Sequence, residues 1–180
     1  TGFPRERVVG MAGILDSTRF RFFIAEKLGV LPSDVFAMVL GGHGDSMVPV
    51  SKYTTVGGFP LDELLSPEEI KELSNRTRTG GAEVINYLKT GSAYYAPAAS
   101  AVEMVQAVLK DEKLVAPASA LLQGEYGYSG LYLGVPVLLG AGGLEKIFEL
   151  PLSDDEKSAL DQSAEAVRKG LADLAEIEKG

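Results

Sequence analysis

The chain contains one histidine, His43, which follows a run of apolar residues and lies within a glycine-rich segment. Histidine is the side chain whose ordinary pKa best suits proton exchange near neutral pH. The glycines at positions 42 and 44 allow the backbone and a bound molecule to approach the ring closely. This setting fits an acid–base catalyst, but a lone histidine is more often structural or simply exposed.

Asp16 and Arg19 are a second pair of residues that could do chemistry. They are three positions apart, so they face the same side if the segment is helical. A carboxylate at position 16 could hold an imidazole ring and favour its protonated form. The guanidinium of Arg19 matches a carboxylate with two parallel hydrogen bonds. In the alternative interpretation, Asp16 only caps a helix and Arg19 is a surface charge.

Each candidate segment follows an apolar stretch that is typical of a buried strand, Val8–Gly13 in the first case and Val35–Leu40 in the second. Asp16 and His43 are 27 residues apart. That separation leaves room for a helix and a returning strand. The sequence therefore allows the two side chains to meet at one edge of a sheet.

Helices are expected directly after the first strand and again near position 100. The first would be capped by Asp16 or Ser17, and its apolar positions and its end are Phe20, Ile24, Leu28 and Gly29. The later helix carries four apolar residues on one face, which are Ala98, Val102, Val105 and Leu109.

Two further helices begin with a capping box, a serine followed three residues later by glutamate. One starts at Ser66 with Glu69, and Gly80–Gly81 is expected to interrupt or redirect it. The other starts at Ser153 with Glu156. Its apolar stripe, expected to pack on its own domain or on a neighbouring subunit, consists of Leu160, Ala164, Val167, Leu171 and Leu174.

Between positions 114 and 140, short apolar runs alternate with glycine, as in hairpins. These runs are Val115–Gln123, Tyr126–Leu133 and Val135–Leu139. There is no repeat, linker or low-complexity tract. We therefore predict one α+β domain over residues 1–180, with a mixed or antiparallel sheet and packed helices.

The composition excludes several classes of function. The 180 residues are 46% hydrophobic and 23% charged, which is enough apolar material for a core. A net charge of −8 disfavours nucleic-acid binding, and no apolar stretch approaches the roughly 20 residues of a membrane span. With no cysteine, disulfides, thiolate zinc sites and cysteine nucleophiles are excluded. Neither a nucleic acid nor a membrane is expected as a partner.

Other motifs are weaker. Gly44-Asp45-Ser46 resembles an esterase nucleophile motif, but no histidine follows Ser46 to serve as its base. A metal site on His43 and Asp45 would have one nitrogen ligand and no obvious third ligand, so no metal is expected. The segment Gly140–Glu145 nearly matches a dinucleotide fingerprint, but it has glutamate where a small residue is needed and is interpreted as a turn.

Taken together, the two candidate segments resemble the lactate/malate dehydrogenase family. The resemblance lies in Leu-Asp-Ser-Thr-Arg-Phe-Arg at 15–21 and Gly-Gly-His-Gly-Asp-Ser-Met-Val-Pro at 41–49. It continues at 53–58, 92–98 and 134–137, and so covers essentially the whole chain. It implies the C-terminal, substrate-binding and catalytic domain of that family over residues 1–180, without the N-terminal Rossmann domain that binds NAD.

The resemblance also implies roles for three residues. His43 would be the general acid/base at the C2 oxygen of the substrate, Asp16 would orient and stabilise its ring, and Arg19 would bind the substrate carboxylate. No residue of this chain is assigned to the cofactor, and Pro97 and Met11 are candidates for positions near the nicotinamide.

Within the family, the chain is more similar to the malate branch. Met11-Ala12-Gly13, Gly42 and Ala93 carry this similarity, since lactate enzymes tend to have threonine at the position of Ala93. The implied function is interconversion of malate and oxaloacetate with NAD, in a cytoplasmic homo-oligomer, dimer or tetramer, of the tricarboxylic acid cycle. The alternatives are a lactate or other 2-hydroxy acid dehydrogenase, and an anion-binding fragment without turnover.

Overall fold

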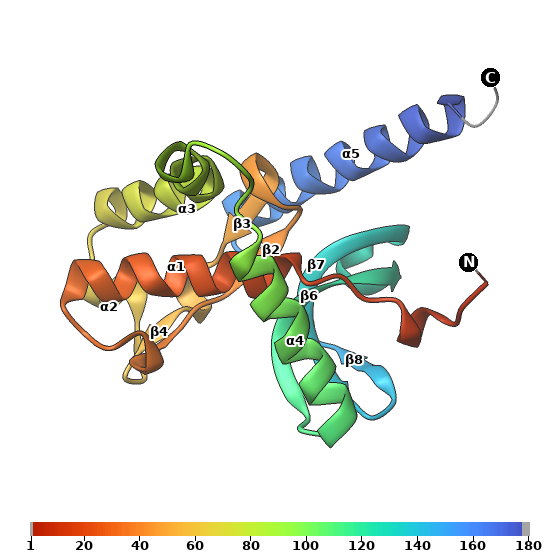
Figure 1. Ribbon diagram of the computed structural model, residues 1–180, viewed down its shortest axis with the longest axis horizontal. Coiled ribbons are helices and arrows are strands. Elements are labelled where there is room, and N and C mark those ends of the chain that lie inside the picture. The colour runs from red at the N-terminus through yellow and green to blue at the C-terminus, as the bar shows by residue number, and fades with distance from the viewer. Residues whose placement is uncertain (1, 178–180) are drawn as a thin grey trace.

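Two antiparallel sheets with helices packed against them make up residues 2–177, the part of the chain that the computed structural model describes (Figure 1). The α-helices are α1 (Ala12–Leu28), α2 (Leu61–Leu64), α3 (Pro67–Leu88), α4 (Tyr95–Lys110) and α5 (Asp154–Ile177). The smaller sheet contains β1 (Val35–Phe36), β4 (Thr55–Val56) and β5 (Phe59–Pro60). The larger contains β2 (Val39–Gly41), β3 (Met47–Pro49), β6 (Leu114–Gln123), β7 (Ser129–Gly140) and β8 (Gly143–Ile147). The predicted α+β class and the antiparallel pairing are confirmed.

The larger sheet runs in the order β3-β2-β7-β6, and β8 also pairs with β7. Its apolar side chains pack with α5 in the main core, where Val135 and Leu160 are fully buried. A second core, with Phe20 and Ile24 at its centre, joins α1 to the smaller sheet and to α3. Burying side chains of this size stabilises the fold by about 1.5–3 kcal/mol each. The first helix is therefore fixed firmly beside both sheets.

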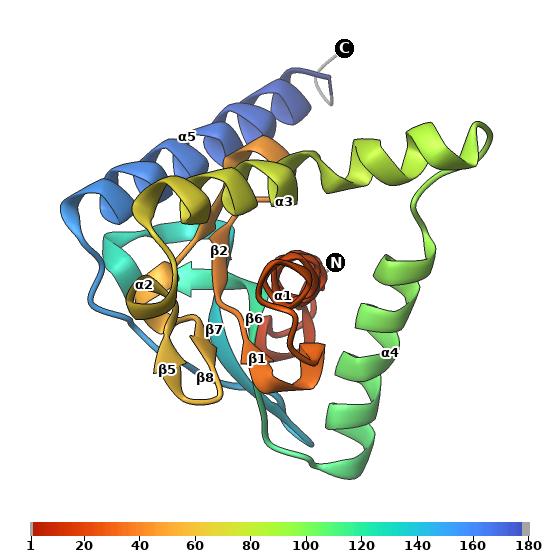
Figure 2. The same cartoon turned by 90° about the vertical axis from the view of Figure 1, so that its left-hand side faces the viewer.

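Helix α1 lies between α4 and the strands, with α3 across it (Figure 2). The predicted strand at Val8–Gly13 is wrong: a single bridge joins Gly10 to Ser119, and the helix already begins at Ala12. A side chain at Gly13 would collide with the carbonyl of Pro117 in β6, so glycine is what allows this close approach. The predicted capping role of Asp16 or Ser17 is wrong for the same reason, because both lie inside the helix.

The predicted strand at Val35–Leu40 is divided between the two sheets, as β1 and β2. At the break, the backbone N–H of Met38 donates to the hydroxyl of Thr54 (3.2 Å), and that of Val39 donates to the hydroxyl of Ser17 (3.1 Å). Buried backbone donors need a partner. Two side-chain hydroxyls thus replace the ladder bonds that the break removes, which a reading of apolar runs does not reveal.

The helix predicted from Ser66 is confirmed together with its capping box. Gly80–Gly81 does not interrupt it, since α3 continues to Leu88. On α4, the predicted apolar face faces solvent, and the helix packs instead through the residues Ser100, Met104 and Ala107. That exposed face is available to contact another surface.

Strand β7 runs through Gly134, where two strands were predicted. A side chain there would collide with the Gly41 carbonyl of the paired β2, so the glycine serves the pairing rather than a turn. The predicted turn at Gly140–Glu145 joins β7 to β8, and the capping box at Ser153 starts α5. No helix within residues 2–177 is both long and apolar enough to cross a membrane.

Candidate active site

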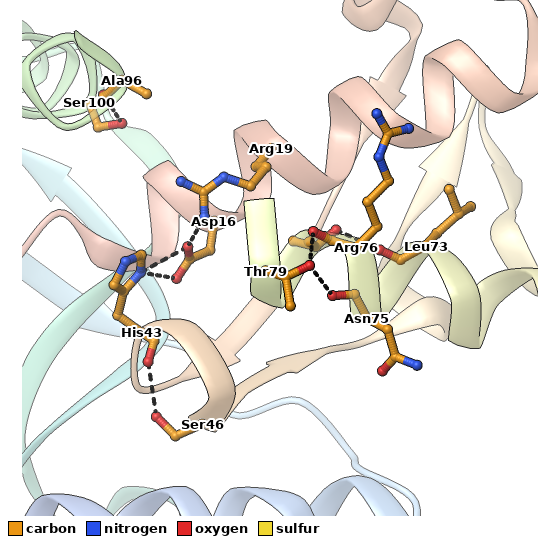
Figure 3. Close-up of polar contacts among 11 residues, drawn as sticks. Asp16, Arg19, His43, Ser46, Leu73, Asn75, Arg76, Thr79, Ala96 and Ser100 are labelled. Atoms are coloured by element: carbon orange, nitrogen blue, oxygen red, sulfur yellow. Dashed lines mark hydrogen bonds and ion pairs between the residues drawn. The ribbon is translucent and has the colours of Figure 1, made fainter. Parts of the chain in front are cut away.

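Asp16 and His43 meet at the edge of the larger sheet (Figure 3). Asp16 lies in the second turn of α1, and His43 lies between β2 and the short 3₁₀ helix η3 (Gly44–Ser46). The imidazole Nδ1 is 3.0 Å from each carboxylate oxygen and hydrogen-bonds to Oδ2. In a neutral ring this contact places the proton on Nδ1 and leaves Nε2 as an acceptor. The expected contact between the two residues is therefore present.

The two partners differ strongly in exposure. The side chain of Asp16 is 1% exposed, whereas that of His43 is 52% exposed. Burial raises the pKa of Asp16 above its ordinary value, and the neighbouring His43 and Arg19 only partly offset that effect. The site thus presents an accessible imidazole whose far side rests on a buried carboxylate.

Arg19 approaches the same carboxylate from one turn farther along α1. Its Nη1 lies 3.5 Å from Oδ1 of Asp16, and its side chain is 12% exposed. Its aliphatic part passes over Gly80 of α3, where any side chain would collide with Cδ of the arginine. Gly80 therefore forms the notch that fixes the guanidinium. Sequence reasoning interpreted Gly80 and Gly81 as a place where the helix is interrupted or redirected, because the contact with Arg19 arises only when α1 packs on α3.

The loop before His43 also contacts the last helix. Gly42 donates its backbone N–H to the hydroxyl of Ser163 in α5 at 2.7 Å. The hydroxyl of Ser46 donates to the carbonyl of His43 at 3.3 Å. Sequence reasoning missed Ser163, because both its burial and its partner are defined only in the folded chain.

A groove of about 460 Å³ opens between α1, α3 and α4 and reaches Arg19. Ala93, in the connection between α3 and α4, lines the same groove. Much of its wall is apolar, including Phe22, Val84 and Tyr87. The two residues that the family resemblance connects with substrate binding and specificity, Arg19 and Ala93, are thus brought to one surface. Among residues 2–177, no group of three or more His, Cys, Asp or Glu side chains could hold a metal ion.

The burial of Asp16 leads to a prediction about stability. The pKa of Asp16 is higher in the folded protein than its ordinary value of 3.8, so the folded state binds the proton more readily than the unfolded chain. As the pH rises from 3.8 through the raised pKa, the free energy of unfolding therefore falls. We expect Asp16→Asn to raise the free energy of unfolding at pH 7 by about 1 kcal/mol. Urea unfolding at pH 7 and near pH 4 measures this, because the gain should shrink at the lower pH.

Asp45→Asn is the matched control, since Asp45 is an exposed aspartate of η3, close to His43 in the sequence, and its replacement should change little. A lower stability of Asp16→Asn at pH 7 would contradict the prediction. It would mean that His43 and Arg19 more than compensate the burial of the carboxylate.

Comparison with known proteins identifies the family of the chain. A family model described as the lactate/malate dehydrogenase, alpha/beta C-terminal domain matches residues 14–178. The chain belongs to the lactate/malate dehydrogenase family. Malate dehydrogenase of Chlorobium phaeobacteroides is 57% identical over 174 residues, which are 97% of this chain and 56% of that protein.

Solved structures of the lactate/malate dehydrogenase family also match. Malate dehydrogenase from Salinibacter ruber has a TM-score of 0.96 at 50% identity, covering 99% of this chain and 58% of that one. Lactate dehydrogenase from Eimeria maxima, solved with NADH and oxamate, has a TM-score of 0.94 at 41% identity, covering 98% and 57%. The resemblance and the C-terminal domain fold predicted from the sequence are confirmed. The chain spans a little over half the length of the relatives it matches.

Proposed function

We propose that residues 1–180 are the substrate-binding and catalytic domain of a dehydrogenase that interconverts malate and oxaloacetate. The observation that carries this proposal is the Asp16–His43 pair, with its exposed imidazole and with Arg19 on the same carboxylate. A proton-exchanging group beside a fork for a carboxylate is what a 2-hydroxy acid requires. The malate relatives and the small Ala93 support the choice of a dicarboxylate over lactate.

In this mechanism, the exposed Nε2 of His43 takes the proton of the substrate hydroxyl during oxidation and returns it to the carbonyl oxygen during reduction. Asp16 keeps Nδ1 protonated, which leaves Nε2 free, and it stabilises the imidazolium that forms. Arg19 binds the C1 carboxylate with two hydrogen bonds and so holds C2 and its oxygen near the ring.

When bound, NAD would accept the hydride in the oxidation and donate it in the reduction. The residues present fit only the reacting end of that cofactor, through the accessible face of His43. The fingerprint-like segment Gly140–Glu145 is the turn between β7 and β8, and Gly143 packs against the backbone of Glu6 there. We therefore propose that the phosphates and ribose bind outside residues 1–180, to a Rossmann domain of the kind that the family resemblance implies. Met11 and Pro97 remain candidates for positions near the nicotinamide.

The direct test is an assay of the complete enzyme, or of this chain joined to the N-terminal part of a malate relative, with NADH and either oxaloacetate or pyruvate. We expect kcat/KM for oxaloacetate to exceed that for pyruvate by at least about 10²-fold. Pyruvate lacks the second carboxylate of oxaloacetate, so the charged groups that bind this carboxylate would be left without a partner. The opposite preference would keep the mechanism and assign a lactate dehydrogenase. Binding of both acids without turnover would favour the non-catalytic alternative, an anion-binding fragment.

The assembly proposed is a homo-oligomer. Apolar side chains are exposed near the end of α3 and along α4, including Tyr87, Val102, Val105 and Leu109. Exposed apolar surface of this kind is typical of surfaces that another protein covers, and a second copy of the chain is the occupant we propose. Sedimentation velocity of the complete enzyme should show a dimer or tetramer, and Leu109→Glu should shift it toward the monomer. A cytoplasmic location and a place in the tricarboxylic acid cycle follow from the family resemblance only.

A further inference from the structure

The loop that carries His43 is held from two sides (Figure 3). Asp16 of α1 binds the imidazole, and α5 runs along the other side of the loop. There the backbone N–H of Gly42, the residue before His43, donates to Oγ of Ser163 at 2.7 Å. The two residues are 121 positions apart in the sequence, so this bond exists only in the folded chain.

Ser163 is itself firmly placed. It is 1% exposed, and its neighbours Leu160 and Ala164 are fully buried in the main core. A buried hydroxyl on a well-packed helix face has little freedom to move. The hydroxyl is therefore a fixed acceptor, and the loop must adapt to it.

The residue before Gly42 shows how closely the loop and the helix fit. Gly41 has φ +83°, a backbone conformation that glycine adopts readily and other residues rarely do. A Cβ added at Gly41 would lie 2.7 Å from Oγ of Ser163. On the sheet side, the Gly41 carbonyl fills the space that a side chain of Gly134 would need. The backbone leading into His43 is thus clamped between β7 and α5.

This clamp matters because the imidazole has little other support. Its side chain is 52% exposed, so packing alone does not define its orientation. The ring position depends on the bond to Asp16 and on the direction in which the backbone delivers the side chain. Losing the hydrogen bond from Gly42 to Ser163 would make the backbone at His43, and hence the direction of its side chain, less well defined.

We propose that Ser163 is a positioning residue for His43, which fixes the loop backbone so that Nδ1 meets Asp16 and Nε2 faces the substrate. Its relevance to catalysis rests on the proposed function, but the coupling itself is a property of the chain alone. Ser163 makes no contact with the reacting atoms in this role.

The test uses the 180-residue chain and its single histidine, whose ring nitrogens give unambiguous ¹⁵N signals. Two observables are recorded without substrate or cofactor: hydrogen exchange of the Gly42 amide, and the tautomer of His43 at a pH where the ring is uncharged. In Ser163→Ala we expect Gly42 to exchange about tenfold faster and the ratio of the Nδ1–H to the Nε2–H tautomer to fall about twofold or more. The Nδ1–H form should dominate in the unmodified chain.

Ser100→Ala is the matched control. Ser100 is also a buried helix serine, but its hydroxyl donates to the carbonyl of Ala96 in its own helix. It should leave both observables unchanged. If Ser163→Ala does not fold, Ser163→Cys serves the same purpose, because it nearly preserves the volume and replaces a strong acceptor with a weak one.

Faster exchange at Gly42 with an unchanged tautomer ratio would overturn the proposal, because the hydroxyl would then anchor the loop without positioning the ring. An unchanged exchange rate would overturn it as well. Neither result depends on enzyme activity, so a failure here is separate from a failure of the oxaloacetate and pyruvate assay.

Discussion

Replacing His43 by glutamine in the complete enzyme is expected to lower kcat for oxaloacetate reduction by about 10²–10⁴-fold. Glutamine retains a polar side chain of similar reach, but it cannot exchange a proton near neutral pH. The structure supports a large effect, because Arg19 is the other described side chain that contacts Asp16. An arginine stays charged and so cannot exchange a proton with the substrate in place of His43. Steady-state kinetics at several pH values measure the loss.

Binding of a non-reacting substrate analogue provides the control for this variant. Its dissociation constant should change much less than kcat, since Arg19 and not His43 binds the carboxylate in the proposed mechanism. A variant that keeps more than about a tenth of the original kcat would remove His43 from proton transfer.

Replacing Arg19 by lysine is expected to lower kcat/KM by about 10²-fold, mainly through KM. Lysine keeps the charge, but a single ammonium cannot reproduce the two parallel hydrogen bonds of the guanidinium. It also cannot occupy the notch over Gly80 in the same way. Initial rates over a range of oxaloacetate concentrations separate the effect on KM from that on kcat.

Arg21→Lys is the matched control for this prediction. Arg21 lies on the same helix but lines a different pocket, next to β1 and β6. Its replacement should leave both constants nearly unchanged. Equal effects of the two substitutions would indicate a general requirement for charge or helix stability, and Arg19 would lose its proposed role.

The three candidate residues could be found in the sequence because each stands in a distinctive short motif. The two apolar runs with polar segments behind them only allowed Asp16 and His43 to meet, and the family resemblance implied their pairing, even though the first run is not a strand. The helix that carries Asp16 simply starts earlier, where Gly13 packs on β6. The prediction of the contact was therefore less sensitive to the boundaries of elements than the prediction of the elements themselves.

Gly80 and Ser163 could not be found in the same way, because each acts on a partner that is distant in the sequence. A glycine in a helix predicts a break when only local propensity is considered. Its actual role depends on Arg19 passing over it, and that is known only once α1 and α3 are packed. Ser163 likewise has meaning only beside the backbone of Gly42.

The buried charge of Asp16 also bears on how such a protein responds to selection. A screen that selects for heat resistance and not for turnover should enrich Asp16→Asn early. The substitution replaces a buried carboxylate by a neutral amide of nearly the same shape. A screen in which growth requires turnover by the enzyme should reject the same substitution. The residue at position 16 should therefore differ between variants selected for thermal stability and variants selected for catalytic activity.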